Sequence, residues 1–420
     1  MALPDPCRLA RIAAVGPDLG LFVHFDAEGI RRAAGAGPAI GALAGWAVGL
    51  KDNIAVRGFP CTAGMAARRQ SLAQRDATVT ARLAAAGALL LPGLAMDEAA
   101  LGAIGSNAHF GRCENPRFPG LVPGGSSCGS AALVAAGLAE AALGTDTLGS
   151  VRIPAAYCGI VGLKPTRGLV GRTAIVPLAP SLDTAGMLVR QVSDFGPLLQ
   201  VLVGYDPEDP DSRPPPAGWA EENELPRKVG IPLAVEEVAC EAEVLEGLAR
   251  ARAALRGAGV DLVPLKMPGW RPEALRRAAF LLVECEAAVV LQNELADPEG
   301  VSSGLRRLLD YGRDASSGRV VGALQEIRAA GAAFDRAMAE VEALLLPTTP
   351  QRAFGWDAPV PANQADFTAL ANVVGAPALA LPVAVANGGP PASVQLVAAA
   401  WSEHRLLSLG ERLADALGEA

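Results

Sequence analysis

The chain has 420 residues, of which 51% are hydrophobic and 19% charged, and its formal net charge is −8. This acidic balance is unlike that of a nucleic-acid binder, which shows a basic face, and no stretch reaches the roughly 18 uninterrupted apolar residues that a membrane-spanning helix needs. Because no low-complexity spacer divides the chain, we expect one domain over residues 1–420 despite the length.

The predicted elements alternate along the chain. Short apolar runs bounded by glycine, proline or charge predict buried strands at 47–50, 88–91, 141–143, 229–231, 262–265, 343–346 and 378–383. Helical patterns lie between several of these runs, at 77–86, 130–139, 241–258 and 322–342. This alternation predicts an α/β fold in which a mixed or parallel sheet is covered by helices on both faces.

Three further segments bear on location and chemistry. Residues 206–224 combine five prolines with seven acidic side chains, which predicts an exposed connection. The first twelve residues carry charges and no apolar run, so they do not resemble a secretory signal, and we expect a cytoplasmic protein. The seven cysteines form no Cys-x-x-Cys pair, and the three histidines lack the spacing of zinc ligands. We therefore expect no disulfide framework, no metal and no cofactor.

Two serines lie 24 residues apart in glycine-rich turns. Ser126 belongs to the turn 124–127 (Gly-Gly-Ser-Ser), and Ser150 ends the segment 145–150 (Thr-Asp-Thr-Leu-Gly-Ser). The first turn precedes the helical pattern at 130–139, and the positive end of a helix favours a developing anion. Both serines are candidates for a nucleophilic site.

A serine hydroxyl is a weak nucleophile until a neighbouring base takes its proton. None of the histidines lies beside either turn in the sequence, whereas Lys51 directly follows the apolar run 45–50. Burial at the end of a strand disfavours the ammonium form and lowers a lysine pKa by several units from about 10.4. We therefore predict a proton relay of Lys51, Ser126 and Ser150.

This pattern resembles the amidase signature family, whose hallmark is a Gly-Gly-Ser-Ser turn followed 24 residues later by the nucleophile. The resemblance covers roughly residues 42–168, includes the segments 96–98, 153–156 and 162–166, and continues more weakly to residue 382. It implies a single amidase signature domain with a large mixed sheet, a catalytic core at about 42–205 and a variable wall of the substrate pocket at about 225–345. The segment 306–317 is expected in that wall.

The resemblance also implies roles for individual residues. Ser150 is the nucleophile, Ser126 is a bridging serine preceded by a cis peptide bond, and Lys51 is the base. Asp146 and Arg152 form a salt bridge that supports the loop around the nucleophile.

The supporting groups of the site follow from the same resemblance. The backbone N–H groups of Thr147, Leu148 and Gly149, with that of Ser150, are candidates for an oxyanion hole. Ser127 supplies a hydrogen bond to the lysine or the substrate region. Thr145, Asn53 and Cys128 are expected to be structural neighbours.

Three departures from the family pattern stand out. Leu148 replaces a usual glycine and is expected to crowd the acyl pocket or to strain the backbone. Cys128 replaces a usual glycine or serine. The stretch before Lys51 is short, so an N-terminal helix or its dimer contacts are expected to be missing.

The function expected is an amidase that converts a small carboxylic amide to carboxylate and ammonia through an acyl-enzyme. One alternative is a hydrolase of biuret- or allophanate-like ureides, which the segment 164–169 suggests weakly. Another is the glutaminase subunit of a tRNA-dependent amidotransferase, although that subunit commonly carries glutamine where Ile153 stands, and a third is an inactive binding protein, raised only by Leu148. The expected partner is a small amide, with no nucleic acid or membrane, and a homodimer is the working assumption.

Overall fold

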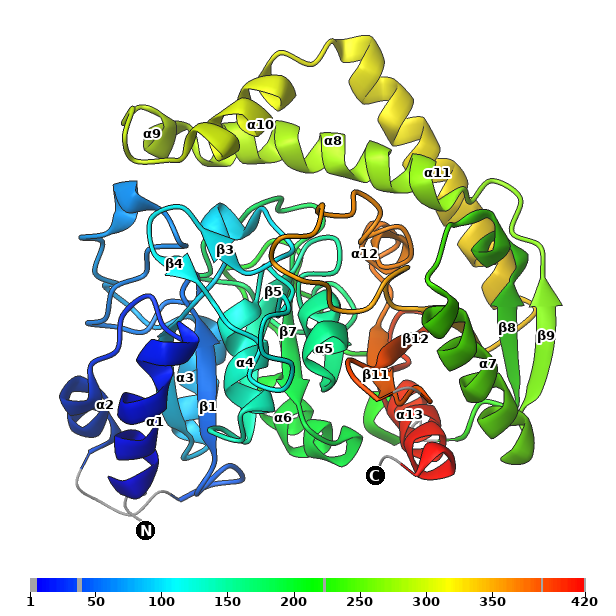
Figure 1. Ribbon diagram of the computed structural model, residues 1–420, viewed down its shortest axis with the longest axis horizontal. Coiled ribbons are helices and arrows are strands. Elements are labelled where there is room, and N and C mark those ends of the chain that lie inside the picture. The colour runs from blue at the N-terminus through cyan, green and yellow to red at the C-terminus, as the bar shows by residue number, and fades with distance from the viewer. Residues whose placement is uncertain (1–5, 36–39, 222–223, 387, 419–420) are drawn as a thin grey trace.

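A mixed β-sheet runs through the molecule (Figure 1), which the computed structural model describes for residues 6–35, 40–221, 224–386 and 388–418. In this part of the chain the sheet has ten strands. Their order across the sheet is β2 (Leu89–Leu94), β1 (Ala47–Lys51), β5 (Ala141–Asp146), β7 (Thr184–Val189), β6 (Val161–Lys164), β11 (Ala378–Val383), β12 (Ala392–Ala398), β10 (Ala343–Pro347), β8 (Lys228–Pro232) and β9 (Asp261–Leu265).

The sheet is parallel at its two ends and antiparallel between them. Strand β1 runs parallel to β2 and β5, and β8 runs parallel to β9 and β10. The strands from β5 through β7, β6, β11 and β12 to β10 pair antiparallel. The mixed sheet that the resemblance implied is therefore confirmed.

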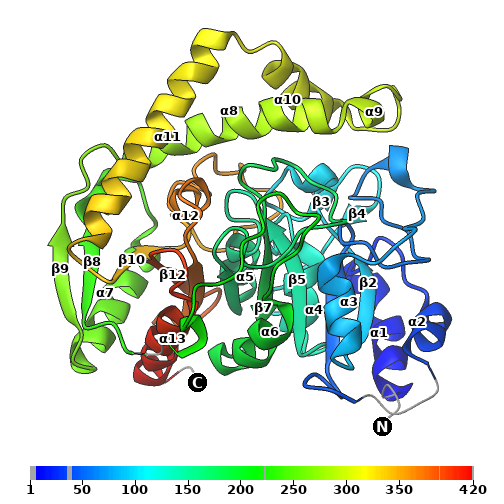
Figure 2. The same cartoon turned by 180° about the vertical axis from the view of Figure 1, so that it is seen from behind.

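Helices cover both faces of this sheet. The helices of the described residues are α1 (Pro6–Leu19), α2 (Ala27–Ala34), α3 (Thr78–Ala85), α4 (Cys128–Ala135), α5 (Arg152–Cys158), α6 (Phe195–Leu202), α7 (Ala242–Gly257), α8 (Pro272–Val290), α9 (Gln292–Leu295), α10 (Ser303–Arg313), α11 (Ser317–Met338), α12 (Ala369–Val373) and α13 (Glu403–Leu417), of which α8 to α11 lie in a separate layer across one edge of the sheet. Helices α4 and α5 lie in front of the sheet in Figure 1, and α3 and α6 lie in front of it when the molecule is seen from behind in Figure 2. Because both faces are covered, strands such as β1 and β5 are buried at every position.

All seven predicted strands and all four predicted helices form, all but the strand 378–383 with shifted ends. Strands β6, β7 and β12 were not predicted. The run of β6 is only four residues long and contains Gly162, and β12 carries the polar Ser393 and Gln395 among its apolar residues. Tertiary pairing in the middle of the sheet, rather than local pattern, makes these segments strands.

Two further segments bear on the expectations from the sequence. Helices α1 and α2 precede β1, and the lack of a further N-terminal helix or of its dimer contacts stays a prediction. The described part of the segment 206–224 is mostly exposed, as expected, but Asp206, Asp209 and Ser212 are buried. The Arg172 guanidinium donates hydrogen bonds to Asp209, one of them at 3.1 Å, and this partner allows the acidic side chain to be buried. Residues 222 and 223 of that segment lie outside the described residues.

A layer formed by α8, α9, α10 and α11 lies across the sheet's upper edge in Figure 1. It belongs to the segment 225–345 that was predicted to form a pocket wall. Three contacts fasten its α9–α10 end to the core. Arg68 pairs with Glu294 at 2.8 Å, the Ala67 N–H donates to the Gly300 carbonyl at 2.8 Å, and the Ser302 N–H donates to Glu98 at 2.7 Å. In the described part of the chain no helix is long and apolar enough to cross a membrane.

Candidate active site

Lys51 ends β1 and is fully buried, with a relative exposure of 0%. Its Nζ donates hydrogen bonds to Ser126 Oγ at 2.7 Å and to Thr145 Oγ1 at 2.9 Å. Strands β1 and β5 are parallel neighbours, so their carboxyl ends meet at one edge of the sheet, and Lys51 and Thr145 lie at this edge. The predicted contact between Lys51 and Ser126 is present.

Burial lowers the pKa of Lys51 from its usual 10.5 to about 8. Opposing this effect, the acidic groups nearest to it, among them Cys128 and Asp97, favour the charged ammonium form. Desolvation prevails because the amine has no access to water. Lys51 can therefore lose a proton at a mildly alkaline pH.

The turn that carries Ser126 is fixed by backbone contacts. The peptide bond between Gly125 and Ser126 is cis, as the resemblance implied, and helix α4 begins two residues later at Cys128. A Cβ on Gly125 would lie 1.8 Å from the Asp97 carboxylate, so only glycine fits here. The Ser127 N–H donates to the Ser150 carbonyl at 3.2 Å. This bond holds the two serine turns side by side.

A buried ion pair supports the loop around Ser150. Asp146 and Arg152 are both inaccessible to solvent and form a two-pronged pair, with both N–O distances 3.0 Å. The carboxylate of Asp146 also accepts the N–H groups of Gly149 at 2.7 Å and Val151 at 3.2 Å, one on each side of Ser150. Asp146 therefore clamps the backbone on both sides of the candidate nucleophile.

Other side chains complete the network around this pair. Arg152 donates to Asn372 at 2.6 Å and to Gln395 at 2.8 Å, and Asn372 donates to Asp146 at 2.9 Å. Burial alone would raise the pKa of Asp146, but the Arg152 charge and these hydrogen bonds hold it at about 2. The carboxylate is thus ionised at neutral pH and stays so in mild acid.

Among the described residues, only some of the backbone N–H groups predicted to form the oxyanion hole are free of other hydrogen bonds. The Gly149 N–H is directed at Asp146, whereas within the described chain no protein acceptor takes the N–H groups of Thr147 and Leu148. Thr147 and Leu148 both line a cavity next to Ser150. Their N–H groups are the freer candidates for binding a developing negative charge.

Two residues have contacts that the sequence did not predict. The Ser127 hydroxyl donates to the Thr145 carbonyl at 3.3 Å rather than to Lys51. The Thr145 hydroxyl accepts hydrogen bonds from both Lys51 and Asn53, the latter at 3.2 Å. Thr145 was expected to be only a neighbour. Its place in the motif segment 145–150 was the one signal that could have found it.

A cavity of about 390 Å³ opens beside Ser150. Its walls are mostly apolar, and they come from the core, from α8 and α10 and from the loop before α12. The lining residues are Ala100, Leu101, Gly102, Ala103, Thr147, Leu148, Ser150, Ile153, Leu178, Arg276, Phe280, Val283, Leu308, Pro361, Ala362, Gln364 and Ala365. We call this space the acyl cavity, because a carbonyl carbon beside Ser150 would direct its acyl chain here.

Leu148 occupies part of the acyl cavity wall without backbone strain. Its φ angle is negative, and the left-handed conformation falls on the next residue, Gly149, with φ 128°. The Leu148 carbonyl accepts a hydrogen bond from Thr368 Oγ1 at 2.6 Å. Leu148 was expected to crowd the acyl pocket or to strain the backbone. The backbone is not strained, and the crowding of the pocket stays a prediction.

An outer hollow of about 820 Å³ adjoins the acyl cavity and shares Leu101 and Leu308 with it. Helix α10 contributes Arg307 and Tyr311 to its lining. The segment 306–317 therefore lies in the wall of the site, as predicted.

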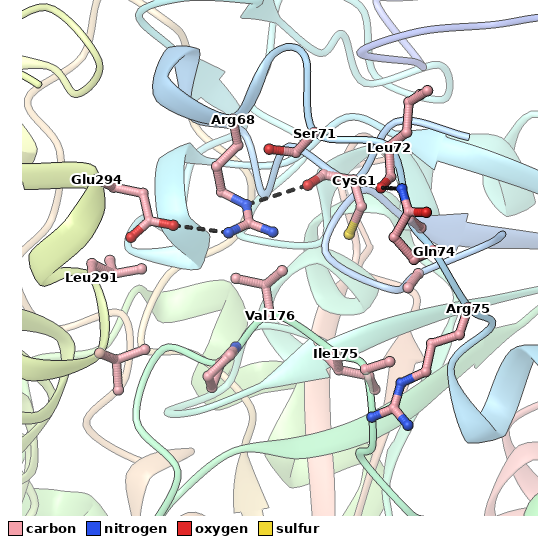
Figure 3. A pocket seen from close by; sticks show the side chains of 15 residues that line it. Cys61, Arg68, Ser71, Leu72, Gln74, Arg75, Ile175, Val176, Leu291 and Glu294 are labelled. Atoms are coloured by element: carbon pink, nitrogen blue, oxygen red, sulfur yellow. Dashed lines mark hydrogen bonds and ion pairs between the residues drawn. The ribbon is translucent and has the colours of Figure 1, made fainter. Parts of the chain in front are cut away.

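A third hollow, of about 400 Å³, lies between the core and the α8–α9 end of the layer, where Leu291 and Glu294 line it (Figure 3). Figure 3 shows Arg68 between Glu294 and the Cys61 carbonyl, to which it donates at 3.3 Å. None of Lys51, Ser126 and Ser150 lines this hollow. Burial raises the pKa of the Cys61 thiol to about 12, so this thiol is not a nucleophile near neutral pH. The acyl cavity is the better candidate site.

Comparisons with known proteins agree with this geometry. The model of the family described as Amidase matches residues 8–407. The chain is 35% identical to a glutamyl-tRNA(Gln) amidotransferase subunit from Synechococcus sp. (strain RCC307), over 97% of this chain and 93% of that protein. A crystal structure described as an amidase superposes with a TM-score of 0.87 at 32% identity, over 99% of this chain and 96% of that one.

A third similar protein is 6-aminohexanoate cyclic dimer hydrolase, solved with its substrate. It has a TM-score of 0.87 and 26% identity, and the match covers 98% of this chain and 92% of that one. The chain therefore belongs to the amidase family, and it is a hydrolase of amide carbon–nitrogen bonds.

Proposed function

We propose that Lys51, Ser126 and Ser150 hydrolyse a small carboxylic amide to a carboxylate and ammonia through an acyl-enzyme. The observation that carries this proposal is the buried hydrogen bond of 2.7 Å from Lys51 to Ser126, in a turn bonded to the backbone of Ser150. A lysine whose pKa is lowered by burial can accept a proton that a solvated lysine cannot.

The proposed acylation step moves one proton through two hydroxyls. Neutral Lys51 takes the proton of Ser126 while Ser126 takes that of Ser150, and the Ser150 oxygen attacks the amide carbonyl. The N–H groups of Thr147 and Leu148 bind the resulting oxyanion, and each such donor lowers the barrier by roughly 3–4 kcal/mol. The proton returns to the leaving nitrogen, which departs as ammonia.

The proposed deacylation step uses the same groups in reverse. Water enters the space that ammonia leaves, gives its proton through Ser126 to Lys51, and attacks the acyl carbon. The Ser150 oxygen leaves with the returned proton, and the carboxylic acid is released. The clamp that Asp146 forms on both sides of Ser150 keeps the nucleophile in place through both steps.

Replacing Ser150 tests this proposal directly. We expect S150A to lose turnover of a panel of aliphatic, aromatic and ureide amides, measured as ammonia release, by at least about 10³-fold. The substitution removes one hydroxyl group and breaks no ion pair, so the melting temperature of S150A should stay close to that of the wild type. A fluorophosphonate probe should label the wild type at Ser150 and leave S150A unlabelled. Unchanged turnover in S150A, or labelling elsewhere, would contradict the assignment.

The similarity to a glutamyl-tRNA(Gln) amidotransferase subunit favours a second candidate, a glutaminase that works within a complex. Ammonia release from glutamine that depends on a co-purifying partner would support it. Hydrolysis of simple amides by the isolated chain would instead favour the amidase. A homodimer and a cytoplasmic location remain our predictions, and the mass in solution tests the first.

A further inference from the structure

Arg276 is the only charged side chain among the described residues that line the acyl cavity. It lies on α8, and its side chain is 16% exposed. The guanidinium Nε donates a hydrogen bond to Asp366, whose side chain is 4% exposed, in the loop before α12. A cation in the wall of the acyl cavity is therefore already paired with a buried anion.

The charges around this pair cancel. Asp366 compensates Arg276, and the nearest other charged groups on α8, Glu273 and Arg277, form an exposed pair with each other. The pair of Arg276 and Asp366 in the wall of the acyl cavity therefore has no net charge.

A second anion beside Arg276 would meet an unfavourable environment. Burial raises the pKa of Asp366 even though Arg276 lowers it. Arg276 therefore does not fully offset the cost of burying this one negative charge. A carboxylate on the substrate would leave one negative charge uncompensated among apolar side chains, which is costly.

Arg276 still has N–H groups that can donate hydrogen bonds to a substrate. A guanidinium carries five N–H donors, and only the Nε donor is used by Asp366. In the part of the chain that the structure describes, no protein acceptor takes the Nη groups of Arg276. Gln364, which also lines this cavity, accepts a hydrogen bond from Tyr157 at 3.1 Å and donates one to the Pro361 carbonyl at 3.2 Å, so one N–H of its amide stays unused. Among the side chains that line the acyl cavity in the described part of the chain, Arg276 therefore has the largest number of unused N–H donors.

We propose that the acyl cavity selects an uncharged, mostly apolar acyl group with a hydrogen-bond acceptor at its far end, which Arg276 binds, and that Asp366 excludes acyl groups ending in a carboxylate. This inference rests on the proposed role of Ser150, which places the acyl group in this cavity. It assigns to Arg276 and Asp366 a specificity role for substrates such as oxo-acyl amides.

Three amides of equal chain length test the proposal on the wild-type protein. They are pentanamide, levulinamide, which has a distal ketone, and glutaramate, which has a distal carboxylate. We expect kcat/KM to be highest for levulinamide and at least about tenfold lower for glutaramate than for pentanamide. Hexanamide and adipamate repeat the comparison with one more carbon, in case the acceptor must reach deeper.

Removing the charge of Asp366 should reverse the discrimination. The D366N variant keeps an oxygen that accepts the Arg276 Nε–H but leaves the guanidinium with a net positive charge. We expect the ratio of kcat/KM for glutaramate to that for pentanamide to rise about tenfold or more. The variant R276M removes the donor, so the ratio of kcat/KM for levulinamide to that for pentanamide should fall to about one. E340Q, which removes an exposed carboxylate outside the acyl cavity, is the control and should change no ratio.

The outcomes separate this proposal from the proposed function. If the wild type prefers glutaramate to pentanamide, or if folded D366N leaves their ratio unchanged, the proposal is overturned while amide hydrolysis stands. If S150A hydrolyses the amides as well as the wild type does, the proposed function itself fails. Melting temperatures show whether each variant folds, and the wild-type comparison decides the proposal even if D366N does not.

Discussion

At the scale of single residues, the site depends on an amine that water does not reach. Lys51 keeps two hydrogen-bond acceptors, Ser126 and Thr145, but has no exposed surface. The acceptors hold the amine in position, and burial makes its neutral form accessible. The hydrogen bonds thus fix the position of the Lys51 amine, whereas burial sets its pKa.

The pH dependence of activity should report the protonation of Lys51. The neutral amine is the active form, and its pKa lies near 8. We therefore expect kcat/KM to rise with pH through about 8 and to level off above it, in a pH–rate profile with a neutral amide. A profile that is flat from pH 6 to pH 10 would contradict Lys51 as the base.

Thr145 should act on the reaction through Lys51. The variant T145V removes the oxygen that accepts a hydrogen bond from the Lys51 amine, which stabilises the charged form, so the pKa of Lys51 falls further. We expect the rising limb of the pH–rate profile to move to lower pH and kcat to fall by roughly tenfold, because the amine loses a positioning contact. T145S keeps the hydroxyl and should restore both values. A T145V profile with an unmoved limb would reduce Thr145 to a packing residue.

The sequence supplied the candidates for the relay but not their full surroundings. Lys51, Ser126 and Ser150 follow from residue type and spacing, and the structure places Lys51 against Ser126. The roles of Thr145 and of Arg276 depend on neighbours far away in the chain, on β1 and in the loop before α12. A local pattern contains no information about such neighbours.

At the scale of elements, the loop from β5 to α5 is held by one buried ion pair. Asp146 ends β5 and Arg152 begins α5, so their bond ties the strand to the helix across the candidate nucleophile. The pattern predicted the strand, whereas β6, β7 and β12 became strands only through their pairing in the centre of the sheet.

Breaking this pair should destabilise the fold as well as the site. The variant D146A leaves Arg152 buried without its carboxylate, which we expect to lower the free energy of unfolding by about 3–5 kcal/mol, measured by urea denaturation. It also frees the N–H groups on both sides of Ser150, so turnover should be lost even where the variant is folded. The double variant D146N/R152M removes both charges and should recover part of the stability without the activity. A D146A variant as stable as the wild type would contradict this role.

At the scale of the whole molecule, the layer of α8 to α11 lies above the edge of the sheet (Figure 1). Its α9–α10 end is fastened to the core by few polar contacts, and Glu98 makes one of them while also bonding His109 at 3.1 Å. Because α8 and α10 contribute to the walls of the acyl cavity, the placement of this layer affects the shape of the site.

Loosening this contact should be visible as local opening. We expect E98A to speed amide hydrogen exchange around the N-terminus of α10, near Ser302, while exchange in β1 and β5 stays unchanged. The exposed Glu299 nearby is the control, and E299A should leave exchange at Ser302 as it is. Equal exchange in E98A and the wild type would show that apolar packing alone holds the layer.

The sequence by itself determined the α/β class, the family and the three candidate relay residues, because alternating apolar runs and a short serine motif are local signals. Only the tertiary structure decided the exposure of Lys51, the order of the central strands and the neutralisation of Arg276 by Asp366. Each of these depends on which distant segments meet in the folded chain. Burial, strand pairing and charge compensation arise from contacts between distant segments, so no single segment of the sequence contains them.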